Sequence, residues 1–158
     1  MNDIAEKNEV SLLQLVLFSL GSELYSVNVM QVQEVLRVTD IAPVPGAPND
    51  IIGIINLRGN VVTVIDARIR FGLVPKETDD RSRIIIVESE EETTGILVDS
   101  VVEVIDLDPS TIESTPKVNN EDSSKYIRGV SSYGGKLFIL VNLQTFLNDE
   151  EIMEVEIF

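Results

Sequence analysis

The sequence predicts a mainly β protein in which two small curved β-barrels pack side by side, with a few short helices. Three observations indicate this fold class: short apolar segments recur between turn residues, long helical patterns are scarce, and one hairpin pattern occurs twice. The chain has 158 residues, of which 44% are hydrophobic and only 5% aromatic. This composition is typical of an aliphatic, strand-rich core, and the length suits one domain or two small lobes that share a core.

The first apolar segment, Ser11–Leu20, alternates with a period of two. Apolar side chains occupy both of its faces, Leu13, Leu15 and Leu17 on one and Val16, Phe18 and Leu20 near the other. This pattern predicts a buried strand, and the turn residues 21–23 lead into a return strand at 24–27. Asn28 is then expected to cap a short helix, because Val29, Val32 and Val35 follow at a helical spacing.

The rest of the chain contains further short elements. Strands are expected at 51–56, 61–66, 83–87, 95–99, 101–105, 126–133 and 137–141, and helical turns at 67–71, after Asp108–Pro109 and at 143–147. Segments 43–48, 88–94 and 117–125 are expected to be loops, and 76–82 a linker. The domain should therefore span 11–148, with lobes at about 11–75 and 82–148, between a flexible N-terminus (1–10) and an acidic tail (149–158).

Two hairpins share one spacing of glycines. Gly59 and Asp66 follow Gly53 by 6 and 13 residues, and Gly135 and Asn142 follow Gly129 by the same distances. Upstream, the sequence VQEV at 32–35 is similar to VVEV at 101–104. Any two hairpins can share glycines, but the matching offsets favour a duplication into two related lobes of roughly 70 residues each. The groove where two such lobes meet is the natural concave binding surface.

Charge and missing residue types exclude several kinds of function. The chain carries 12 Lys and Arg against 27 Asp and Glu, a net charge of −15, and it contains no His and no Cys. It therefore lacks the ligands of a structural zinc site, the partners of a Cys–His or Ser–His dyad, and a redox thiol. Nucleic acid and anionic membranes are poor partners for so acidic a chain. No apolar run is long enough to span a bilayer, and residues 1–9 do not resemble a signal peptide, so we expect a soluble cytoplasmic protein.

Asp66 and Asp99 are the candidates for catalytic or metal-binding carboxylates. Each ends an apolar strand, and a pair of acids can hydrolyse glycosides or hold Mg²⁺. An aspartate at the end of a strand more often accepts hydrogen bonds from turn amides. A carboxylate-dependent metal protein or hydrolase is therefore kept as an alternative, and no cofactor or metal is predicted.

Arg58 is expected at the tip of an otherwise apolar hairpin, between Leu57 and Gly59. A guanidinium there can bind a carboxylate through two hydrogen bonds, either on Glu34 or on a partner, although it could also be a solvated turn residue. Gly53 is expected inside the preceding strand, where glycine usually marks a bulge or a close approach of two backbones.

Around this hairpin the sequence resembles the CheW family of chemotaxis coupling proteins. Residues 45–71, PGAPNDIIGIINLRGNVVTVIDARIRF, contain the family pattern G-x-x-N-L-R-G followed by an apolar strand that ends in D-x-R. Three more blocks are similar and stand in the same order: VMQVQEVLRV, GILVDSVVEVI and YIRGVSSYGGKLFILVNLQTFL. Together they extend the resemblance over nearly the whole chain.

The resemblance implies two intertwined five-stranded barrels around an apolar junction. It also implies a scaffold without catalytic activity that couples the cytoplasmic tip of methyl-accepting chemoreceptors to the regulatory domain of the histidine kinase CheA. Such a protein is recruited to membrane-associated receptor arrays and can form rings with other CheW-like domains. A coupling protein of a related chemosensory pathway, such as surface motility, is the alternative.

Site residues can be carried over by position from the same resemblance. The receptor groove would include Val32, Glu34, Arg58, Val101 and Val104. The kinase contact would include Gly53, Ile54 and Leu15. The receptor would bind as a helix whose apolar stripe lies between the two lobes.

Overall fold

The computed structural model describes residues 11–89, 92–114 and 125–148. The expected flexible N-terminus 1–10, the acidic tail 149–158 and most of the expected loop 117–125 lie outside the described residues. The strands are β1 Leu13–Leu20, β2 Glu23–Asn28, β3 Val32–Arg37, β4 Ile51–Leu57, β5 Asn60–Asp66, β6 Arg83–Glu88, β7 Thr93–Val98, β8 Ser100–Leu107, β9 Ile127–Tyr133 and β10 Lys136–Val141. The helical segments are η1 Val29–Gln31, α2 Ala67–Arg70, η2 Pro109–Thr111 and α4 Leu143–Leu147.

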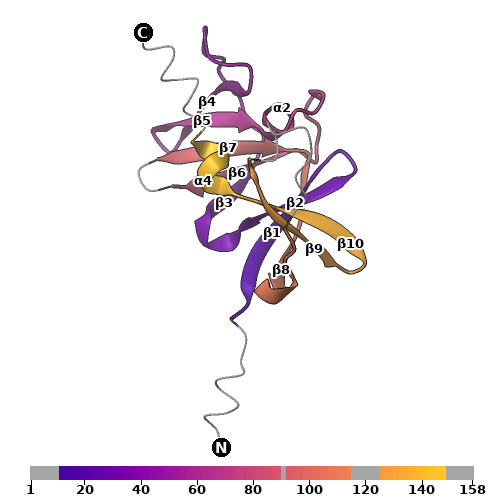
Figure 1. The fold of residues 1–158 in the computed structure, drawn as a ribbon. Coiled ribbons are helices and arrows are strands. Elements are labelled where there is room, and N and C mark those ends of the chain that lie inside the picture. The colour runs from indigo at the N-terminus through magenta and orange to yellow at the C-terminus, as the bar shows by residue number, and fades with distance from the viewer. Residues whose placement is uncertain (1–10, 90–91, 115–124, 149–158) are drawn as a thin grey trace, which may run out of the picture.

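The strands form two five-stranded sheets, which confirms the mainly β class. The terminal sheet has the order β8-β1-β2-β10-β9 and the central sheet the order β3-β6-β7-β5-β4. Figure 1 shows the central sheet in the upper part of the molecule and the terminal sheet in the lower part. An isolated bridge, Ala42 with Ile54, links the segment after β3 to the opposite edge strand of the central sheet, and Glu113 with Val130 does the same in the terminal sheet. Each sheet is therefore barrel-like.

The two sheets repeat each other strand by strand. Gly53 pairs with Val64 in the central sheet, and Gly129 pairs with Leu140, 11 residues later as well, in the terminal sheet. Edge strand β3 has a bulge between Val32 and Glu34, and β8 has one between Val101 and Glu103. The similarity between 32–35 and 101–104 thus extends to a local irregularity, which supports the duplication inferred from the hairpins.

The composition of the sheets differs from the expected lobes 11–75 and 82–148. Hairpin β1–β2 pairs with β8 and β10 from the second half of the chain, whereas β6 and β7 pair with β3 and β5 from the first half. The two halves have therefore exchanged equivalent hairpins. A repeat in sequence reveals which segments are alike, but equivalent hairpins fit either sheet, so it does not reveal with which copy each one pairs.

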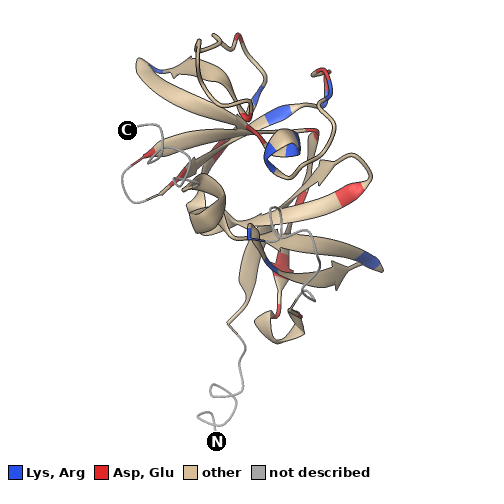
Figure 2. Cartoon of the chain, turned by 45° about the horizontal axis from the view of Figure 1, so that its top comes forward, with Lys and Arg blue, Asp and Glu red and all other residues tan. Residues whose placement is uncertain are grey.

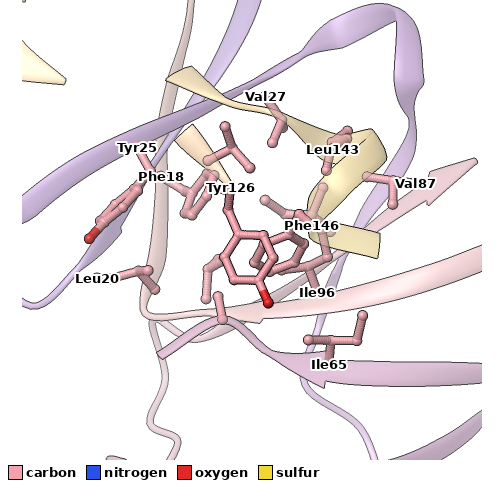
Figure 3. Packing of buried hydrophobic residues seen from close by; sticks show 14 of the residues in the cluster. Phe18, Leu20, Tyr25, Val27, Ile65, Val87, Ile96, Tyr126, Leu143 and Phe146 are labelled. Carbon is pink, nitrogen blue, oxygen red and sulfur yellow. The ribbon is translucent and has the colours of Figure 1, made fainter. Parts of the chain in front are cut away.

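Alternate faces of the inner strands build separate parts of the core. The junction core joins both sheets and the helices α2 and α4 (Figure 3): Val16, Phe18, Leu20, Tyr25, Val27, Ile65, Ala67, Phe71, Ile85, Val87, Ile96, Val98, Tyr126, Val141, Leu143 and Phe146. Leu15 and Leu17 point instead into a cluster inside the terminal sheet. The central sheet encloses an equivalent cluster that includes Ile84 and Ile86. The two apolar faces predicted for the first strand are confirmed.

The predicted helix after Asn28 is wrong for most of its length. Asn28 caps η1 by accepting a hydrogen bond from the Met30 amide at 2.8 Å, but the helical turn ends at Gln31 and β3 follows. Valines at a spacing of three gave the helical pattern. β-Branched residues favour strands, and β3 pairs with β6 along its whole length apart from one bulge, so tertiary pairing decides the conformation. The helical turns predicted after Asp66 and Asn142 are confirmed, each with that residue as its cap.

Candidate functional site

Arg58 lies in the turn between β4 and β5 and has a backbone φ of +51°. A side chain in this left-handed region costs roughly 1 kcal/mol, which glycine would avoid. Its equivalent in the second hairpin is indeed a glycine, Gly134, with φ +60°. The Asn56 side chain accepts a hydrogen bond from the Gly59 amide at 2.8 Å and holds the turn. The central sheet therefore keeps an arginine in a backbone conformation better suited to glycine.

The Arg58 guanidinium binds the Glu34 carboxylate through two hydrogen bonds. Nη1 donates to Oε1 at 3.4 Å, and Nη2 donates to Oε2. Glu34 lies on β3 and Arg58 follows β4, so the pair connects the two edge strands of the central sheet. The hydrogen bonds from Arg58 lower the pKa of Glu34, and Glu34 raises the pKa of Arg58, so both side chains stay charged at neutral pH. Arg58 keeps 66% of its side-chain surface exposed, against 26% for Glu34.

An open hollow of about 560 Å³ adjoins this ion pair. It is lined by Gln33, Leu57, Arg58, Asn60, Val61, Val62, Thr63, Glu92 and Thr93. Val61 on its wall is 70% exposed. The hollow thus offers a cation and an apolar side chain together, which suits an amphipathic protein segment.

The predicted receptor residues fall into three situations. Glu34 and Arg58 are brought together, as expected. Val32 and Val101 occupy equivalent positions at the starts of the two edge strands, and both are partly buried against the junction core. Val104 lies on β8 of the terminal sheet and is exposed. The structure thus joins the charged residues and distributes the valines over both sheets.

The predicted kinase residues do not form one surface. Leu15 is only 3% exposed and lies in the terminal sheet, whereas Gly53 is buried in the central sheet. Ile54 is half-buried and exchanges two backbone hydrogen bonds with Ala42, at 2.8 and 2.9 Å. Neither Leu15 nor Gly53 offers appreciable surface in this structure, so Ile54 is the one predicted kinase residue with surface for a direct contact.

Sequence reasoning missed a pair of exposed apolar residues. Val61 follows Gly53 by eight residues and Leu137 follows Gly129 by eight, and their exposed fractions are 70% and 75%. Both stand near the start of the second strand of their hairpin. The sequence did contain a signal for them, because an apolar residue follows the polar turn at the same distance from the first glycine in both hairpins.

Asp66 and Asp99 both form hydrogen bonds with Arg68 of α2. Figure 2 shows the ribbon of this short helix coloured for basic residues, with acidic segments nearby. Asp66 Oδ1 accepts hydrogen bonds from the backbone amides of Arg68 and Ile69, at 2.9 and 3.4 Å. The Asp99 carboxylate accepts hydrogen bonds from Nε and Nη2 of Arg68, at 2.8 and 2.6 Å, and from the Gly21 amide, at 2.7 Å. Both carboxylates thus have structural roles. Among the described residues, no three His, Cys, Asp or Glu side chains gather in a metal-binding arrangement.

Replacing Asp99 by asparagine is expected to lower the free energy of unfolding at neutral pH by about 2 kcal/mol, because Arg68 loses a charged acceptor. The hydrogen bonds from Arg68 hold the pKa of Asp99 below its ordinary value. A depressed pKa stabilises the fold above the unfolded-state pKa, about 3.9, and this contribution is lost as pH falls through the folded-state value. Urea unfolding should therefore show a difference between wild type and variant that narrows below about pH 4. A constant difference would contradict an electrostatic origin.

No helix among the described residues is long and apolar enough to cross a membrane. The family model described as CheW-like domain matches residues 14–151. The chain is 32% identical to the chemotaxis protein CheW of Rhizobium meliloti over 87% of its length and 89% of that protein. It is also 32% identical to CheW of Treponema pallidum over 90% of its length and 86% of that protein. The crystal structure of the scaffolding protein TtCheW from Thermoanaerobacter tengcongensis superposes with a TM-score of 0.80 at 36% identity, covering 88% of this chain and 90% of that one.

Proposed function

The chain belongs to the CheW-like family of chemotaxis coupling proteins, and from that premise we propose that it links methyl-accepting chemoreceptors to the histidine kinase CheA. It acts as an adaptor without catalysis or cofactor, in the cytoplasm, at membrane-associated receptor arrays. The family match over residues 14–151 carries this proposal. The structural roles of Asp66 and Asp99 support it against the alternative of a carboxylate-dependent hydrolase or metal protein.

The receptor contact involves Arg58 and the edge strands β3 and β8. A receptor tip is helical, and a helix binds a groove through apolar anchors while polar groups at the rim set its register. Val32, Val101 and Val104 supply apolar contacts, and Arg58 with Glu34 supplies the polar rim. The uncommon backbone of Arg58 supports this assignment, because local strain is often kept where a side chain must be presented to a partner.

The kinase contact involves the β4–β5 hairpin of the central sheet, at Ile54 and Val61. Val61 offers exposed apolar surface, and Ile54 lies on an edge strand. Leu15 and Gly53 contribute through the fold alone. Because the receptor and kinase contacts share one hairpin, a change in how the receptor holds Arg58 can alter how β4 and β5 meet the kinase.

Replacing Arg58 by alanine or by glycine is expected to weaken receptor binding about tenfold, because both remove the guanidinium from the rim of the groove. Glycine suits the left-handed turn, so Arg58→Gly separates the loss of the ion pair from any change in the turn. Binding of each variant to a purified cytoplasmic receptor fragment is measured by calorimetry, with circular dichroism to check the fold.

Arg81→Ala is the matched control. Arg81 is an exposed arginine in the linker, and its backbone amide donates to Asp79. Receptor affinity equal in all three variants would remove Arg58 from the proposed contact. The function itself is tested by assembling receptor fragment, CheA and this chain: if the kinase sediments with the receptor fragment equally well without the chain, the coupling role is refuted.

A further inference from the structure

The ion pair of Arg58 and Glu34 has a counterpart in the terminal sheet that is only half present. Glu34 pairs with Ile86 just after the bulge of β3, and Glu103 pairs with Leu17 just after the bulge of β8. Glu103 is therefore the structural equivalent of Glu34. The position equivalent to Arg58 is Gly134, since each lies five residues after the equivalent glycines Gly53 and Gly129.

The terminal sheet keeps the backbone of this site but lacks its cation. Gly134 has φ +60°, close to the +51° of Arg58, so the two turns have the same left-handed shape. The two cations of this hairpin do not replace Arg58: Lys136 takes the place of Asn60 and Arg128 that of Ile52, and neither forms an ion pair with a described acid. Within the part of the chain that the structure describes, the Glu103 carboxylate has no hydrogen-bonding or ion-pairing partner.

This unpaired carboxylate and the exposed Val104 lie on opposite faces of β8. Glu103 pairs with Leu17, which faces the cluster of the terminal sheet, whereas Val104 pairs with Val16, which faces the junction core, and is 56% exposed. Because β8 is an edge strand, a partner that lies along it can meet the charge on one side of the strand and an exposed apolar side chain on the other. The chain as a whole carries a net charge of −15, so an occupant of complementary charge is cationic.

We propose that a partner helix lying along edge strand β8 supplies the missing arginine: its guanidinium binds Glu103, and an apolar side chain of the same helix covers Val104. Arginine fits better than lysine, because the equivalent intramolecular pair uses two parallel hydrogen bonds from a guanidinium. This inference rests on the proposed function, since Val104 belongs to the receptor contact, and it makes Glu103 the residue that selects the receptor segment. The central sheet thus has its own arginine, Arg58, whereas the terminal sheet binds an arginine of the partner.

Gly134→Arg tests the equivalence of the two sites. An arginine at this left-handed position should bind Glu103 as Arg58 binds Glu34, and so compete with the partner. We expect Gly134→Arg to weaken binding of the receptor fragment about fivefold, and Glu103→Gln to weaken it by a similar factor. The double variant should bind no more weakly than either single one, because both act on the same carboxylate. Additive losses would overturn the inference.

Glu77→Gln is the control for the change of charge, since Glu77 is an exposed glutamate of the linker. On the receptor side, each arginine of the fragment is replaced in turn by glutamate, and one of these changes should restore binding to Glu103→Arg. Failure of every such exchange would overturn the inference, as would equal affinity of Glu103→Gln and Glu77→Gln. If the unchanged chain does not bind the fragment, the proposed function fails; if Arg58→Ala weakens binding and Glu103→Gln does not, the inference alone fails. Thermal unfolding of Gly134→Arg confirms its fold, and Glu103→Gln gives an independent result if that variant is unstable.

Discussion

Gly53→Ala is expected to lower the free energy of unfolding by about 4 kcal/mol, from backbone strain and overpacking together. A Cβ atom on Gly53 would lie 2.3 Å from the carbonyl oxygen of Ala42 and 2.7 Å from Cγ2 of Ile41. Ala42 cannot move aside freely, because its amide and its carbonyl both form hydrogen bonds with the backbone of Ile54. The residue also has φ +153°, which side chains rarely adopt. Urea unfolding followed by circular dichroism measures the loss.

Two other glycines separate the contributions to this effect. Gly46 has φ +84° and open space around the position of a Cβ, so Gly46→Ala should cost about 1 kcal/mol from the backbone alone. Gly129 is the structural equivalent of Gly53, and its Cβ would lie 2.7 Å from Cγ2 of Ile112 and 2.9 Å from the Glu113 carbonyl. Gly129→Ala should therefore fall between the other two. Equal losses in Gly46→Ala and Gly53→Ala would contradict the close approach of the two backbones.

The same measurement separates fold from function at Gly53. The sequence places this glycine in a hairpin for which a kinase contact is expected, yet the residue is buried. If a Gly53 variant binds the kinase more weakly, the loss of binding should be proportional to the fraction of the protein in which the hairpin is unfolded. Val61→Ser changes the exposed surface of the same hairpin without entering the core, so it tests the kinase contact more directly.

Local features of the fold could be predicted from the sequence. The alternation in 11–20 predicted a strand with two apolar faces, and the segments that follow the two hairpins predicted helical turns. The residue patterns alone did not predict the exchange of hairpins between sheets, because β1 and β6 have similar patterns and each fits either sheet; only the family resemblance implied intertwined barrels. Valines spaced three apart were ambiguous for the same kind of reason, since only the pairing with β6 makes 32–37 a strand.

In the candidate site, too, some features could be predicted from local sequence patterns and others depend on tertiary pairing. Arg58 and Glu34 could be paired from sequence, because cations are few in this chain and a hairpin tip exposes its residues. Leu15 was assigned to a surface although its own alternation pattern placed it inside a strand with two buried faces. The similarity of VQEV at 32–35 to VVEV at 101–104 already aligns Glu103 with Glu34. The two bulges that support this equivalence are defined by hydrogen bonding between strands distant in sequence, and a bulge has no local sequence signal.

Arg70→Met is expected to lower the free energy of unfolding by about 3 kcal/mol, because it leaves the charge of Asp50 buried and unpaired. Arg70 is only 6% exposed, and its Nε donates to Asp50 Oδ2 at 2.8 Å. Its Nη1 donates to the Phe146 carbonyl at 2.6 Å, and its guanidinium lies 5.6 Å from the centre of the Phe146 ring. Since α2 follows the central sheet and α4 follows the terminal sheet, this one side chain connects the helices of both.

A double-mutant cycle tests whether the unpaired charge causes the loss. Asp50 Oδ1 is already buried without a hydrogen-bonding partner, so Asp50 depends on Arg70 for compensation of its charge. Arg70→Met combined with Asp50→Leu should recover most of the stability that the single variant loses, because the buried carboxylate is then absent. Arg70→Lys keeps the charge without the planar fork and should lie between wild type and Arg70→Met. If the double variant is no more stable than Arg70→Met, the loss comes from packing against Phe146, and the two sheets are then held together at this point by dispersion contacts instead of the ion pair.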